Sequence, residues 1–241
     1  MPNLDYELDK DLRQSYRGGF TYLNPIYKEK DVGQTVVLDV NSLYPSCMYY
    51  KDIPYGEPVF FEGQYQDDTV YPLYIQQITC DSFKIKKNKI PTIQVKNNRF
   101  LKENEYLEEY NTNGKLDPLC LVLTNIDLRL FLEHYEVENL NYVCGWKFKA
   151  CDFLFKKYID KWINVKIQAT KEKNAGQRQM AKLQLNSLYG KLATSLEIQS
   201  KIPYMGEDEI IHYKLSEKEI KNGIYLPARF FYYFLCKRSY N

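Results

Sequence analysis

The stretch Thr35-Val36-Val37-Leu38-Asp39-Val40-Asn41-Ser42-Leu43-Tyr44-Pro45-Ser46 decides how the rest of the sequence is interpreted. Its first four residues are apolar or β-branched, which predicts a buried strand over 35–38. A single carboxylate, Asp39, stands where this strand should end, and Pro45 suits the first position of a following helix because its missing N–H costs nothing there. A lone acid at the end of a buried strand is costly unless a cation meets it. Asp39 is therefore a candidate metal ligand, with a helix cap as the alternative.

The bulk composition is that of a globular chain. The 241 residues, 44% hydrophobic and 27% charged, are enough for one large domain or two small ones. The six cysteines lack the spacing of a zinc site, the start lacks the pattern of a signal peptide, and no apolar run approaches the ~20 residues of a membrane span. These features predict an intracellular protein with free thiols and no membrane partner.

The charge is unevenly distributed, although the net charge is only +2. Residues 156–191 hold nine Lys or Arg against two acids, and this segment has the pattern of two helices, over 152–173 with Asp152 as N-cap and over 177–194. In the second helix one stripe is apolar, and another, about a quarter turn away, carries cations, an amide and an aromatic ring. The apolar stripe is Ala181, Leu185, Leu188 and Leu192; the other is Arg178, Lys182, Asn186 and Tyr189.

The second stripe matches what a nucleoside triphosphate requires. Cations neutralise phosphates, and a tyrosine ring can stack on a base. The small Ser187 and Gly190 leave room for a base pair to approach. A helix whose polar side happens to be basic is the alternative.

The remaining segments predict an α+β unit over 51–153 and an irregular hairpin or loop over 195–223. Strands are expected at 59–61, 70–83, 91–95 and 141–148, with a helix over 124–135 capped by Thr124. Within this unit, Tyr65-Gln66-Asp67-Asp68 imitates a catalytic carboxylate hairpin, but Glu62-Gly63-Gln64 precedes it instead of an apolar strand. We therefore interpret it as a surface turn.

Three motifs resemble those of family B DNA polymerases. Asp39-Val40-Asn41-Ser42-Leu43-Tyr44-Pro45-Ser46 resembles motif A, and Lys182-Leu183-Gln184-Leu185-Asn186-Ser187-Leu188-Tyr189-Gly190 resembles motif B. Tyr16-Arg17-Gly18-Gly19 resembles the Tyr-x-Gly-Gly motif that precedes motif A and contacts the template. Tyr55-Gly56-Glu57-Pro58 and the long insertion between the motifs resemble the protein-primed subgroup found in linear-DNA phages and plasmids.

The resemblance implies an α+β fold divided into five parts. Residues 1–50 would be a palm portion, 51–153 a first insertion that contacts the terminal protein, and 154–194 the two fingers helices. Residues 195–225 would be a second terminal-protein insertion, and 226–241 a truncated stub of the returning palm. Because the residues after Ala228 depart from the family pattern, and a one-base shift would restore it, we also hypothesise a frameshift there.

The resemblance assigns roles to particular residues. Asp39 would be a catalytic carboxylate holding two Mg²⁺ ions, or Mn²⁺ in their place, with the Val40 carbonyl as a further ligand. Tyr44 would lie under the incoming sugar and exclude a 2′-hydroxyl. Nucleotide-binding residues would be Leu43, Tyr44, Lys166, Arg178, Lys182, Asn186 and Tyr189; DNA-binding residues would be Tyr16, Gly18, Gly19, Ser42, Ser187 and Gly190. The implied partners are template–primer DNA, deoxynucleoside triphosphates and a terminal protein.

Other parts of the family pattern are absent from the sequence. The second carboxylate motif, the exonuclease domain and the thumb are missing, so we expect the isolated chain to have little or no activity, because one carboxylate cannot hold two Mg²⁺ ions. Two alternatives stay open: a degenerate remnant that only binds DNA, nucleotide or terminal protein, and a structural α+β domain with accidental motifs.

Overall fold

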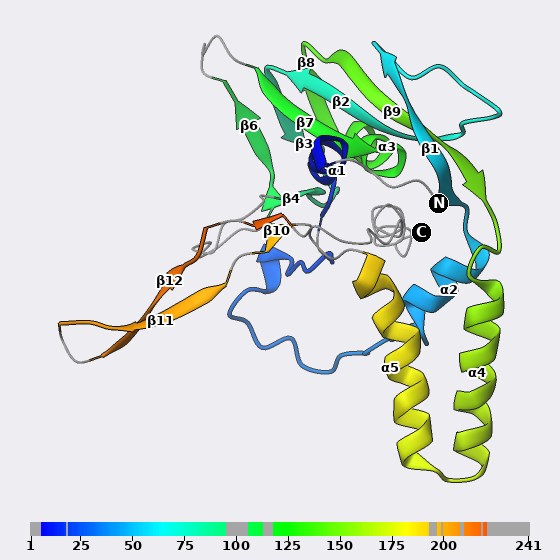
Figure 1. Cartoon of the computed structure of the whole chain (residues 1–241). Coiled ribbons are helices and arrows are strands. Elements are labelled where there is room, and N and C mark those ends of the chain that lie inside the picture. The colour runs from blue at the N-terminus through cyan, green and yellow to red at the C-terminus, as the bar shows by residue number, and fades with distance from the viewer. Residues whose placement is uncertain are drawn as a thin grey trace.

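The computed structural model describes residues 6–17, 19–94, 106–112, 118–192, 197–198, 200–207, 210–217 and 219–220. The described chain is α+β, as predicted, with antiparallel sheets in one region and a pair of long helices in another (Figure 1). The expected stub over 226–241 lies outside the described residues. Within the described part, no helix combines the length and apolar composition that crossing a membrane requires.

The larger sheet has four antiparallel strands in the order β1-β9-β2-β7. They are β1 (Ile53–Glu62), β9 (Asn141–Cys151), β2 (Leu73–Cys80) and β7 (Leu119–Thr124). A helix covers each face of β7: Val122 joins the core of α1 (Tyr6–Arg13), whereas Leu121 and Leu123 join that of α3 (Asn125–His134). Thr124 caps α3 by accepting a hydrogen bond from the Asp127 amide, as predicted.

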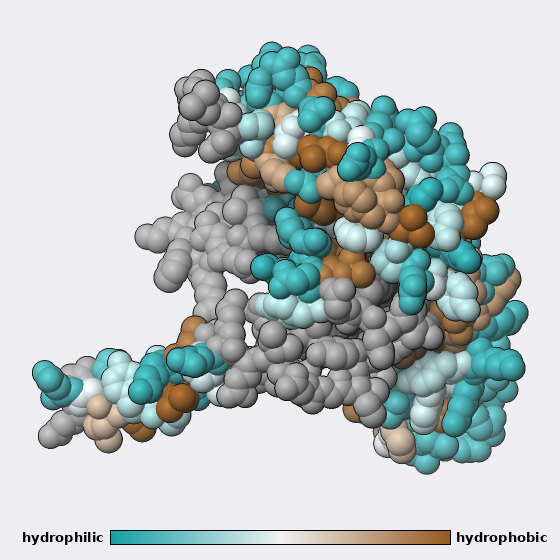
Figure 2. Space-filling view, turned by 45° about the horizontal axis from the view of Figure 1, so that its top comes forward, coloured by the Kyte–Doolittle hydropathy of each residue, from teal (hydrophilic) through white to brown (hydrophobic). Residues whose placement is uncertain are grey.

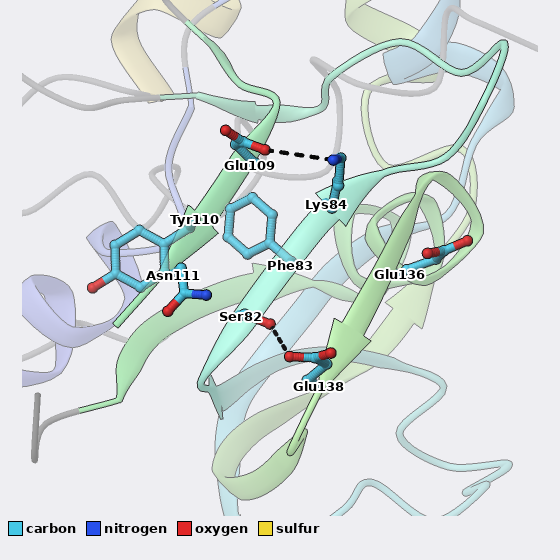
Figure 3. Close-up of a pocket in the computed structure, with 8 residues that line it drawn as sticks. All are labelled: Ser82, Phe83, Lys84, Glu109, Tyr110, Asn111, Glu136 and Glu138. Carbon is cyan, nitrogen blue, oxygen red and sulfur yellow. Dashed lines mark hydrogen bonds and ion pairs between the residues drawn. The ribbon is translucent and has the colours of Figure 1, made fainter. Parts of the chain in front are cut away.

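A smaller sheet, β6-β3-β8, extends this α+β unit. Its strands are β6 (Glu109–Asn111), β3 (Ser82–Ile85) and β8 (Tyr135–Glu138), and the nearby β4 (Ile93–Gln94) pairs with β5 (Tyr106–Leu107). One face of the small sheet packs Phe83 and Tyr135 into the α3 core. The other face forms a hollow of about 670 Å³ whose floor is polar (Figure 3).

The basic segment forms a pair of adjacent helices, α4 (Lys156–Lys171) and α5 (Ala175–Leu192), with α2 (Leu43–Tyr50) beside them (Figure 1). Met48, Ile159 and Leu185, one from each helix, are buried in a shared core. The helix starts differ from the predictions. The first begins at Lys156 rather than Asp152, and the second begins at Ala175 because the Asn174 side chain caps it by accepting from the Gln177 amide.

The predicted strand over 35–38 is wrong. Residues 31–40 form no helix or strand, and the side chains of Val36, Val37 and Leu38 are 84–89% exposed. An apolar sequence forms a buried strand only where neighbouring strands supply backbone partners and a covering layer. None of the strands in the described part of the chain pairs with this segment. A short 3₁₀ turn, Pro25–Tyr27, lies on the path that leads to it.

The expected hairpin after α5 is confirmed within the described residues. β11 (Lys201–Met205) pairs with β12 (Ile211–Leu215), and β10 (Glu197–Ile198) pairs with β13 (Glu219–Ile220) at its base. Figure 2 shows β11 and β12 projecting from the rest of the surface, with hydrophobic and hydrophilic patches mixed along them.

Candidate nucleotide-binding site

The start of α2 is an unusual helix start held by a lysine from α4. Ser42, in the capping position, has a left-handed backbone (φ 54°, ψ 46°) and its side chain does not cap the helix. Instead, the Lys166 ammonium donates a hydrogen bond to the Ser42 hydroxyl at 3.2 Å. The helix begins at Leu43, earlier than the Pro45 start that the sequence predicts. A left-handed serine is uncommon, and such strain is maintained where the surroundings fix it, often at functional sites.

Tyr44 and Tyr189 join α2 to α5 in one stacked pair. Their ring centroids are 4.3 Å apart and the rings are inclined by 16°. Leu43 and Leu188 pack beside them against the core shared by the helices. The structure therefore brings together two predicted nucleotide-binding tyrosines that lie far apart in the sequence.

The two predicted stripes of α5 have opposite environments. Ala181 and Leu185 are 0% and 2% exposed, and Leu188 is half-buried. The side chain of Leu192 lies outside the described residues. Arg178, Lys182, Asn186, Ser187 and Gly190 are all exposed. The cationic and amide groups of this face are thus available to an anionic ligand.

Asp39 and Val40 precede this site on the exposed segment. Asp39 is exposed and Val40 is 57% exposed. Among the described residues, no group of three or more His, Cys, Asp or Glu is close enough to hold a metal ion. One carboxylate and one carbonyl therefore do not make a site for two Mg²⁺ ions, which need several oxygen ligands and a fixed geometry.

The Tyr-x-Gly-Gly segment connects α1 to the site. The Tyr16 ring packs against the core between α1 and the large sheet, so it is half-buried, and Gly18 lies outside the described residues. A Cβ added to Gly19 would lie 3.9 Å from the Tyr44 hydroxyl, so this glycine lies close to the stacked tyrosines. This segment is therefore the third part of the chain, after α2 and α5, that lies at the site.

Sequence reasoning missed the residues that hold this segment. The Arg17 guanidinium donates to the carbonyls of Gln14 at 2.6 Å and of Val122 at 3.4 Å, and its burial lowers its pKa although Asp127 partly opposes that shift. Tyr106 contacts Phe20, Thr21 and Tyr22. The sequence around Tyr106 carries no signal of such contacts, because they depend on the tertiary fold.

Two other polar features lie outside this site. The Tyr65–Asp68 segment belongs to no helix or strand, and its Asp68 carboxylate accepts hydrogen bonds from the amides of Val70 and Tyr71 and from the Lys147 ammonium. In the hollow of the small sheet, Lys84 pairs with Glu109, and the Ser82 hydroxyl donates to Glu138 (Figure 3). The hollow is thus built largely from side chains that already interact with each other.

Comparison with known proteins identifies the family. The family described as DNA polymerase type B, organellar and viral, matches residues 1–236. The chain belongs to this family. It is 48% identical to the DNA polymerase of Bacillus phage phi29 over 95% of this chain, and 30% identical to that of Streptococcus phage Cp-1 over 95%. It spans only 38% and 40% of those two relatives.

Solved structures of a family B polymerase share the fold of this chain. Phi29 DNA polymerase complexed with primer-template DNA and incoming nucleotide substrates superposes with a TM-score of 0.81 at 46% identity, covering 98% of this chain and 39% of that one. An orthorhombic crystal form of the same polymerase gives a TM-score of 0.83 at 45% identity, with 98% and 39% covered. The match extends over nearly the whole chain, so the resemblance seen in the motifs holds for the fold.

Proposed function

We propose that this chain is the palm-and-fingers portion of a protein-primed, DNA-directed DNA polymerase. The observation that carries the proposal is the meeting of three distant segments at one place: Gly19, the start of α2, and the exposed face of α5. The phi29 structure that it resembles is described as holding primer-template DNA and incoming nucleotide. Template–primer DNA, deoxynucleoside triphosphates and a terminal protein are the proposed partners.

The nucleotide would bind across the faces of α4 and α5. Lys166, Lys182 and Arg178 would neutralise its phosphates, since cations on adjacent helices can converge on one triphosphate. Asn186 and Tyr189 would frame the new base pair, and Tyr44, next to Leu43, would lie under the sugar. Template and primer contacts would come from Tyr16, Gly18, Gly19, Ser42, Ser187 and Gly190.

Nucleotidyl transfer by two metal ions requires more ligands than the described residues bring together. Asp39 and the Val40 carbonyl would supply one side of a Mg²⁺ site, and further carboxylates would be needed to complete it. We therefore expect the purified 241-residue chain to bind substrates and to extend a primer negligibly. Templated, Mg²⁺-dependent extension by the purified chain would contradict this expectation.

The test of the nucleotide site is direct binding. We expect Lys182→Ala to weaken binding of a fluorescent deoxynucleoside triphosphate by at least about 10-fold, because a hydrogen bond to a charged group contributes about 1.5–3 kcal/mol. Lys171→Ala is the matched control, since Lys171 is also an exposed helical lysine but belongs to the last turn of α4. An equal loss of nucleotide affinity in both variants, or no nucleotide binding by the wild-type chain, would contradict the proposed nucleotide site.

The second candidate is a degenerate polymerase remnant that binds DNA, nucleotide or terminal protein without catalysing a reaction. The exposed, isolated carboxylate of Asp39 favours this candidate. The two candidates differ in how nucleotide affinity responds to Mg²⁺. In a polymerase portion, Asp39→Asn weakens the Mg²⁺-dependent part of triphosphate binding, because the carboxylate shares the ion with the phosphates. In a remnant, the same substitution leaves binding unchanged at every Mg²⁺ concentration.

A further inference from the structure

Tyr106 holds three consecutive residues that follow the Tyr-x-Gly-Gly segment. It opens β5 and its side chain is 6% exposed. The Thr21 amide donates to its hydroxyl at 3.1 Å, although the two residues are 85 positions apart. The Tyr106 ring lies 4.8 Å from the Phe20 ring and meets Tyr22 edge-on, with centroids 6.5 Å apart. One side chain of the α+β unit therefore contacts the Thr21 backbone and the rings of Phe20 and Tyr22.

The other side of the segment is fixed by the same unit. Arg17 is anchored to the Val122 carbonyl of β7. Gly19 thus lies between two attachment points, one at Arg17 and one at residues 20–22, which contact Tyr106. Because glycine places little restriction on its own backbone, the position of Gly19 depends on these attachments.

Gly19 lies between residues 20–22 and the proposed nucleotide site. It lies close to the Tyr44 hydroxyl, and Tyr44 in turn stacks on Tyr189 of α5. A displacement of residues 19–22 would therefore alter the space beside the stacked tyrosines. Packed side chains and hydrogen bonds can carry energetic coupling between two sites.

We infer that Tyr106 is a positioning residue for the template strand, acting through residues 19–22 next to the Tyr44 side chain. The inference rests on the proposed function in one respect: the segment must contact the template strand. Tyr106 itself would touch no substrate. It would position residues 19–22, which are the residues proposed to contact the template strand.

The first experiment measures whether the attachment exists. Tyr106→Phe keeps the ring contacts with Phe20 and removes only the hydroxyl that accepts from Thr21. We expect hydrogen exchange of the Thr21 amide to accelerate about 5-fold, as loss of one typical hydrogen bond implies. Tyr110→Phe is the control, because Tyr110 is a half-buried tyrosine of the adjacent strand β6 that stacks on Phe83.

The second experiment measures the consequence in the full chain. We expect Tyr106→Phe to weaken binding of a primer–template with a single-stranded 5′ overhang by about 5-fold, and binding of the blunt duplex by less than 2-fold, because one hydrogen bond is lost at the template segment. The melting temperature should stay close to that of Tyr110→Phe. Phe20→Leu, which weakens the ring contact and keeps the hydrogen bond, should reduce overhang binding in the same direction.

The outcomes separate the inference from the proposed function. If Tyr106→Phe accelerates exchange at Thr21 but binds overhang DNA like the wild type, the inference is overturned and the proposed function stands. If binding of the overhang DNA and binding of the blunt duplex weaken equally, the role of Tyr106 is structural and the inference is also overturned. If the wild-type chain binds neither DNA, the proposed function fails, and the positioning role fails with it.

Discussion

Cys80 is the thiol whose chemistry the fold changes most among the described residues. It is fully buried in the core between β2 and α3, and burial raises the pKa of its thiol to about 11, with a smaller contribution from Asp81. Because the thiolate is the reactive form, we expect Cys80 to resist iodoacetamide at pH 8 while the exposed Cys120 reacts. Mass spectrometry of labelled peptides checks this, and unfolding in urea should abolish the difference. Equal labelling of both cysteines in the folded chain would contradict it.

The ionisation of Asp68 makes the stability of the folded chain depend on pH. Its hydrogen bond from Lys147, at 2.7 Å, is the main reason that its pKa lies below the ordinary value. A carboxyl with a lowered folded-state pKa contributes stability that is present above its unfolded pKa and lost as the pH falls through its folded pKa. We expect Lys147→Met to raise the Asp68 pKa in an NMR titration and to lessen the loss of stability on acidification below about pH 4. An unchanged Asp68 titration would show that the ion pair does not persist in solution.

At the scale of an element, β9 depends on the absence of a side chain at Gly145. A Cβ there would lie 2.2 Å from the Ile75 carbonyl oxygen and 2.4 Å from a ring carbon of Phe61, so backbone or ring must move. We expect Gly145→Ala to lower the free energy of unfolding by about 1–3 kcal/mol, as overpacking does. Gly176→Ala is the control, since it lies in the first turn of α5 with its nearest contact at 3.7 Å, and helix propensity favours alanine by up to about 1 kcal/mol. Urea denaturation measures both variants, and a neutral Gly145→Ala would refute the packing argument.

The elements that the sequence predicts well are those whose determinants are local. Thr124 caps α3, and the alternation of Ala181 and Leu185 with exposed cations follows from helix periodicity alone. Short strands such as β6 and β8 escape prediction because they hold few residues and are fixed by pairing with β3. The strand expected over 35–38 fails for the same reason, since its formation depends on partners rather than on its own residues. Local patterns therefore predict α3 with its cap and the stretches that become β1, β2, β4 and β9, whereas short strands and strand pairing require long-range information.

At the scale of the whole molecule, the motifs reveal which residues share the candidate site but not what supports them. The resemblance assigns Tyr44, Lys166 and Tyr189 to one site, and in the structure Tyr44 stacks on Tyr189 while Lys166 bonds Ser42 at the start of the same helix. Tyr106 and Arg17 support the site from another part of the fold, through contacts across 85 and 105 positions. No periodicity or spacing encodes such contacts. The α+β unit over 51–153 is thus in direct contact with the segment that leads to the site.

The exposed segment over 31–40 affects the whole molecule, because it can promote self-association of the chain in solution. Val37 is 89% exposed within an apolar run, and an exposed unpaired run of this kind favours association between chains. We expect Val37→Lys to reduce self-association in analytical ultracentrifugation and to change the free energy of unfolding by less than about 0.5 kcal/mol, since few native contacts are lost. Ile75→Ala, at a position only 1% exposed, should cost about 2–5 kcal/mol and leave self-association unimproved. Strong destabilisation by Val37→Lys would show that the segment packs against the fold in solution.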